Sequence, residues 1–149
     1  MQVTGIERDF GGEVRRFDLS PIGAWRAVES RCGVGIGRVF ARLWSCMARD
    51  VDGRVNPAVF EFTGDDIREV LFQGLKGAGM PDAEASKLVR LYFDQADGKA
   101  QFATLAVEIV SAFWLGMPEG KTKAPQTDSE AAQPATASTS APYTEPAQP

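Results

Sequence analysis

The stretch that decides the fold is DDIREVLFQGLKGAGM, residues 65–80, which predicts a helix ending in a glycine-rich corner. Thr63 precedes it as a candidate N-cap, because its hydroxyl can accept a hydrogen bond from an unpaired amide of the first turn. The carboxylates of Asp65 and Asp66 suit the positive end of the helix dipole. The apolar residues recur at intervals of three and four and therefore share one face: Ile67, Val70, Leu71 and Leu75.

Three glycines form the corner, and they permit close packing and backbone conformations that a Cβ would forbid. No side chain in this stretch can do chemistry on a substrate, so it is expected to pack. If it also binds a partner, it would form one wall of a groove for another protein's helix. The candidate partner-binding residues are Leu71, Gly74, Leu75, Gly77, Gly79 and Met80.

Composition excludes several classes of function. The 149 residues carry a net charge of -4 and lack histidine. There is no basic excess to neutralise phosphates, so nucleic-acid binding is not expected. Without histidine the commonest general base and metal ligand are missing, so we expect no enzyme and no catalytic, cofactor-binding or metal site.

The cysteines and the targeting pattern favour a cytoplasmic protein of the host or producer cell. Cys32 and Cys46 lie among apolar residues without a CxxC spacing. We interpret them as reduced thiols, although a disulfide between them remains open. Residues 1–10 lack a secretory pattern, and the longest apolar segment, residues 102–115, is too short for a membrane span.

The N-terminal residues 2–19 predict a β-hairpin. Large apolar and β-branched residues alternate with charged ones on both sides of Gly11 and Gly12, a pair suited to a tight turn. Ser20 and Pro21 then predict a helix start, with serine as the N-cap and proline in the first helical position. The expected inner face of this helix consists of Ile22, Trp25, Val28 and Cys32.

A glycine run, GVGIG at residues 33–37, has two interpretations. A nucleotide-binding loop would need GxGxxG directly after a buried strand, or a following Lys and Ser/Thr. Here the glycines follow a predicted helix and have a different spacing. The pattern therefore favours a corner between two helices, with nucleotide binding as the minor alternative.

The next predicted helix, about residues 37–49, has an apolar stripe that suits the core first and a partner groove second: Val39, Phe40, Leu43, Trp44 and Met47. Its arginines, Arg38, Arg42 and Arg49, are interpreted as solvated, with a basic groove as the alternative.

Residues 50–57 predict a loop with a weak likeness to a calcium site at Asp50, Asp52, Asn56 and Glu61, in which Pro57 and Val59 stand where ligands are needed. Residues 59–62 could add a third strand to the hairpin.

Two further helices follow, at about residues 81–95 and 99–115. The first has its apolar stripe at Ala85, Leu88, Val89, Tyr92 and Phe93. The second has a wide apolar face that either forms the centre of the core or leaves a patch for a partner: Phe102, Leu105, Ala106, Ile109, Val110, Phe113 and Trp114.

The C-terminal part, residues 118–149, is rich in Pro, Ala, Ser and Thr and is expected to be disordered, because it cannot bury enough apolar surface to offset its ordering entropy. The sequence thus predicts one α+β domain over residues 1–117. We expect an N-terminal hairpin, a possible third strand and about five helices.

The order of the motifs resembles the tail assembly chaperone-like proteins of phages and gene transfer agents. The resemblance covers about residues 12–116. It rests on GEVRRFDL (12–19), CGVGIG (32–37), DIREV (66–70), GLKGAGM (74–80), the segment 85–94 and a closing helix that ends at Gly116.

The resemblance implies a non-enzymatic protein that holds the tape-measure protein until tail tube subunits polymerise around it. A structural tail tube component, associated with the particle and able to self-associate, is the alternative. A tube wall normally needs extensive β-sheet, and at most three short strands are predicted, which favours the chaperone.

Overall fold

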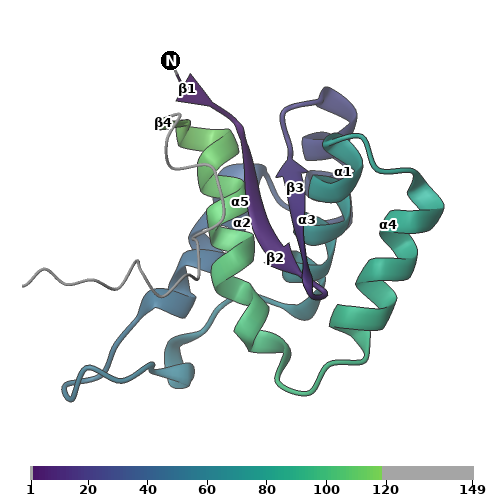
Figure 1. Ribbon diagram of the computed structural model, residues 1–149. Helices are drawn as coiled ribbons and strands as arrows, with labels where there is room; N and C mark the ends of the chain where they lie inside the picture. The colour runs from purple at the N-terminus through teal and green to yellow at the C-terminus, as the bar shows by residue number, and fades with distance from the viewer. Residues whose placement is uncertain (1, 119–149) are drawn as a thin grey trace, which may run out of the picture.

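An antiparallel hairpin begins the fold and lies across the helices (Figure 1). The structure is a computed structural model that describes residues 2–118. Strand β2 (Gly5–Phe10) pairs with β3 (Glu13–Asp18) in a register that runs from Gly5 opposite Asp18 to Phe10 opposite Glu13. Gly11 and Gly12 make the turn with φ angles of 71° and 86°, which glycine adopts without strain. The predicted hairpin and its turn are confirmed.

The inner face of the hairpin belongs to the hydrophobic core. Ile6, Phe10 and Phe17 are buried on this face, whereas Val14 on the opposite face is 59 % exposed. Strand β2 contacts helix α5 (Ala103–Leu115), and β3 contacts α3 (Gly64–Gly77). One side of this small sheet is therefore covered by helices and the other faces solvent.

The two ends of the described chain meet in a second short ladder. Strand β1 (Gln2–Val3) pairs antiparallel with β4 (Met117–Pro118). The third strand predicted at residues 59–62 is not formed, because a 3₁₀ turn, η2 (Pro57–Val59), occupies its start. Pro57 has no amide hydrogen to give to a sheet, and the Asn56 side chain caps the turn by accepting the Ala58 N–H.

Helix α3 is the centre of the helical layer and contacts β3, α1 (Ile22–Cys32), α4 (Asp82–Val89) and α5. The remaining helix, α2 (Ile36–Trp44), packs against α5 and continues into a 3₁₀ turn, η1 (Ser45–Met47). A π-helical segment, η3 (Arg90–Asp94), extends α4, and a 3₁₀ segment, η4 (Lys99–Phe102), leads into α5. A hairpin with five α-helices within residues 2–118 confirms the α+β class. The predicted tail lies outside the described residues apart from Pro118.

The two helix starts predicted from capping residues have different outcomes. Thr63 is confirmed as an N-cap: its hydroxyl accepts the Asp66 N–H, and the Asp66 carboxylate accepts the Thr63 N–H. Ser20 is not a cap. Helix α1 begins one residue later than expected, with Pro21 at the N-cap and no side-chain cap.

The inner face of α1 differs in part from the prediction. Ala24 and Val28 are buried, Trp25 and Cys32 are partly buried, and Ile22 is 64 % exposed in the first turn. Ile22 is therefore a surface residue, and the small Ala24 side chain lets α1 approach the end of α3.

Candidate functional site

The predicted partner-binding corner is mostly buried within the chain itself. Leu71 and Leu75 have no exposed surface. A Cβ on Gly74 would lie 3.2 Å from the Phe17 ring, and one on Gly77 would overlap the Asp18 carbonyl oxygen. These two glycines thus allow α3 to press against β3.

The end of α3 is closed by Gly79 and Met80. The Met80 N–H donates to the Leu75 carbonyl, the Gly79 N–H donates to the Lys76 carbonyl, and Gly79 has a φ of 107°. A hollow of about 270 Å³ remains beside the corner, lined by Gly77 together with Pro21, Gly23, Ala24, Gln73 and Lys76. A partner role for the corner stays a prediction, and this hollow is the surface through which it would act.

An ion pair next to this helix has no signature in the sequence. Arg42, expected to be solvated, donates from its guanidinium to the Asp66 carboxylate at 2.5 Å. Asp66 is fully buried, and its other oxygen accepts the Thr63 N–H. The pair joins α2 to the start of α3. No spacing in the sequence links the two residues, so only the fold shows the contact.

The thiol of Cys32 lies close to the same carboxylate. Both cysteines are free. Burial, and then the negative charge of Asp66, raise the pKa of Cys32 to about 12, and burial also raises the pKa of Cys46. Thiols held in the protonated form are poor nucleophiles, which suits a structural role.

The glycine run at residues 33–37 is a helix–helix corner. Gly33 ends α1 with a left-handed conformation, and Gly35 is the N-cap of α2. The Ile36 N–H at the start of α2 donates to the Glu29 carboxylate at 2.8 Å. An anion from the chain therefore occupies the amide that a phosphate would need, which speaks against the nucleotide-binding alternative.

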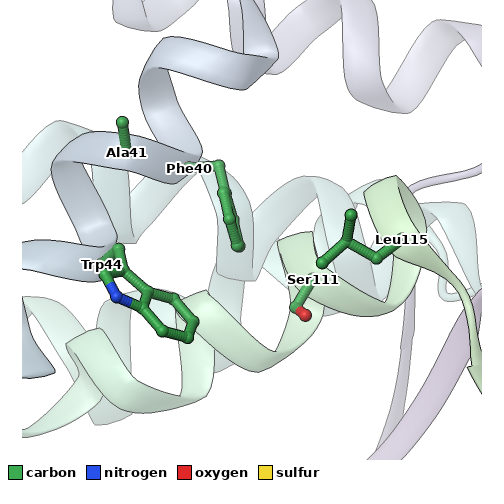
Figure 2. A pocket seen from close by; sticks show the side chains of 5 residues that line it. All are labelled: Phe40, Ala41, Trp44, Ser111 and Leu115. Atoms are coloured by element: carbon green, nitrogen blue, oxygen red, sulfur yellow. The ribbon is translucent and has the colours of Figure 1, made fainter.

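An apolar groove lies between α2 and α5 and is a candidate binding surface. It has a volume of about 430 Å³ and is lined by Phe40, Ala41 and Trp44 from α2 and by Ser111 and Leu115 from α5. Figure 2 shows the Phe40 and Trp44 rings of α2 and the Leu115 side chain of α5 turned toward the space between the two helices. Trp44 is 50 % exposed and Leu115 is 61 % exposed, so large apolar side chains face solvent here.

Helices α2 and α5 each have apolar residues on two faces, one buried in the core and one exposed beside the groove. Val39 and Leu43 of α2 point into the core, whereas the rings of Phe40 and Trp44 contact each other, with centroids 5.6 Å apart, on the outer side. On α5, Ile109 and Val110 are buried and Trp114 is 51 % exposed. Each helix thus contributes to the core and also leaves apolar surface exposed to solvent, and partner binding at that surface stays a prediction.

The side chains that line the groove can bind another molecule through apolar contact but carry no group for catalysis. Its lining has a single polar side-chain atom besides the indole nitrogen, the Ser111 hydroxyl, and no ionisable group. Within residues 2–118, no group of three or more Cys, Asp or Glu side chains could hold a metal ion. None of the helices in this range is long and apolar enough to cross a membrane. The surface can bind apolar side chains of another chain.

A protein-family model matches residues 5–116, which include nearly every element of the fold. The family is described as phage tail tube protein, GTA-gp10. The chain belongs to this family. It is thus a phage or gene-transfer-agent tail protein, as the resemblance implied. Of the two roles expected from the sequence, the match supports the tail tube component better than the chaperone. No curated protein and no solved structure matches the chain.

Proposed function

We propose that this protein is a non-enzymatic structural component of the tail and works at the tail tube. The family match over residues 5–116 carries this proposal. The structure supports it through a well-packed core combined with an apolar groove between α2 and α5, which is suited to contact with neighbouring tail subunits.

The small sheet bears on how such a component would contribute. Within residues 2–118 the hairpin pairs only two strands, and the β1–β4 ladder is two residues long on each side. A continuous sheet around a tube cannot come from these strands alone. Contacts through helices, with the groove as the main apolar surface, are therefore the proposed means of assembly.

Quantitative mass spectrometry of purified particles tests this proposal. A structural component should be present in many copies, in a fixed ratio to the other tail proteins. Its abundance should remain after particles are washed at high salt, because an apolar contact is not screened by ions. Absence from particles, or a ratio far below that of the tail proteins, would refute the structural role.

A second candidate function is a chaperone that binds the tape-measure protein during assembly. The observation that favours it is the groove between two helices, because such grooves hold amphipathic helices. In that case the protein would act in the cytoplasm and leave before the particle is complete.

Co-purification with the tape-measure protein tests the chaperone role. The groove variant Trp44→Ala should lose the complex, and Val14→Ala, which changes an exposed apolar residue on the hairpin, should keep it. If the tape-measure protein does not co-purify with the unmodified chain at micromolar concentration, the chaperone role is wrong. The two candidates thus make opposite predictions about particles and about soluble complexes.

A further inference from the structure

The loop at residues 50–56 presents an apolar side chain to solvent on an ordered support. Val51 is completely exposed in the turn formed by residues 50–53, where the Gly53 N–H donates to the Asp50 carbonyl. The Asp50 N–H donates to the Arg54 carbonyl, and the Asp50 carboxylate accepts the N–H groups of Asp52 and Arg54 at 2.8 and 2.9 Å. The loop projects from the helices at the lower left of Figure 1. These hydrogen bonds give the loop a defined shape, although residues 50–55 are all exposed.

We propose that this loop docks in the groove between α2 and α5 of a second copy of the chain, with Val51 against Phe40, Trp44 and Leu115. The groove is open and apolar, and its volume of about 430 Å³ is large enough for a branched aliphatic side chain. Val55 in this loop and Val59 just after it are 48 % and 46 % exposed. These two side chains extend the apolar contact.

The charges of the two surfaces are complementary. Residues 50–56 contain two acidic residues, Asp50 and Asp52, and one basic residue, Arg54, so the loop has a net negative charge. Helix α2 carries two arginines and no acidic residue. Arg42 is paired with Asp66, and Arg38 is exposed and has no ion pair within the described residues. Arg38 lies three residues, about one helical turn, before Ala41 of the groove lining, so its positive charge is carried by the helix that forms this wall of the groove.

The contact joins two different surfaces, so each copy that offers its loop still has a free groove. Such head-to-tail contacts continue from copy to copy and give a ring or a filament. This inference rests on the proposed function in that a tail tube component must contact its neighbours, and it names the two surfaces that would do so.

Cross-linking between two variants, each with one introduced cysteine, tests the contact. The full-length variants Val51→Cys and Ser111→Cys are purified separately, one with an affinity tag, and are treated with a short bismaleimide alone and as a mixture. The proposal predicts a cross-linked pair in the mixture only. The unmodified chain measures the background from Cys32, which is partly buried, and from Cys46, which is buried. A product in Ser111→Cys alone, or none in the mixture, would overturn the proposal.

Sedimentation at increasing concentration gives an independent measure. Val51→Asp should weaken self-association by about tenfold or more, because an apolar contact is replaced by a charge. Val14→Asp adds the same charge at another exposed valine, which lies on the hairpin, and should leave association unchanged. Circular dichroism should show both variants folded. Equal association of Val51→Asp and the unmodified chain would contradict the proposal.

The results separate this inference from the proposed function. If the chain is abundant in particles but the mixed cross-link fails, the loop–groove contact is wrong and the structural role stands. If the cross-link forms but particles lack the chain, the self-contact is correct and the structural role is wrong.

Discussion

The glycine corner at the end of α3 and the groove between α2 and α5 are both rich in apolar and small residues, yet they differ in what covers them. At the corner, Gly77 leaves room for the backbone of β3, and Leu71 and Leu75 are covered by the chain itself. At the groove, Trp44 and Leu115 keep half or more of their surface in solvent. Apolar character alone therefore does not identify a binding surface in this protein, whereas exposure in the fold does.

The largest expected effect comes from filling the corner. Gly77→Ala places a Cβ 1.9 Å from the Asp18 carbonyl oxygen, so α3 and β3 must move apart. We expect a loss of about 3 kcal/mol or more in the free energy of unfolding, up to failure to fold. Urea denaturation followed by circular dichroism measures this loss.

Gly23→Ala is the matched control for that change, because a Cβ at this position in α1 meets nothing within 4 Å. It should stabilise the protein by about 0.5–1 kcal/mol through better helix propensity. If both variants are equally stable, the close approach of α3 to β3 is not what Gly77 provides.

A smaller loss should follow from removing Arg42. Arg42→Met leaves the fully buried Asp66 carboxylate without its cation, and we expect a cost of about 2–3 kcal/mol. Arg38→Met on the same helix changes an exposed arginine and should alter stability by no more than about 0.5 kcal/mol. Equal effects in thermal denaturation would mean that the buried pair is unimportant for joining α2 to α3.

The cap of α3 should contribute less again. Thr63→Ala removes the hydroxyl that accepts the Asp66 N–H and should cost about 1 kcal/mol. Ser20→Ala removes the hydroxyl that was predicted to cap α1 and does not do so, and its effect should be close to zero. Denaturation curves of the two variants compare a cap seen in the structure with one inferred only from the sequence.

The sequence could predict what depends on neighbouring residues. The hairpin follows from Gly11 and Gly12 between alternating strands, and the start of α3 follows from Thr63 and Asp66 three positions apart. The start of α1 was wrong by one residue because Ser20 and Pro21 both suit a helix start, and local chemistry does not decide which residue occupies the N-cap.

The candidate site depended on contacts between distant residues and was only partly predictable. The periodicity of α2 and α5 indicated apolar faces broader than one core contact needs. It could not show that Phe40 and Leu115 come together across a groove, since they lie 75 positions apart in the sequence. The Arg42–Asp66 pair was missed for the same reason.

The smallest expected effect on stability tests the comparison most directly, because the same substitution is made on both surfaces. Leu115→Ala should change the free energy of unfolding by less than about 1 kcal/mol, since Leu115 is already 61 % exposed and leaves no cavity. Leu75→Ala should cost about 2–5 kcal/mol, since Leu75 is fully buried beneath the corner. In sedimentation, Leu115→Ala should nevertheless weaken self-association, because it removes part of the groove wall. A stable Leu75→Ala variant, or unchanged association in Leu115→Ala, would mean that the assignment of the corner to packing and the groove to binding is wrong.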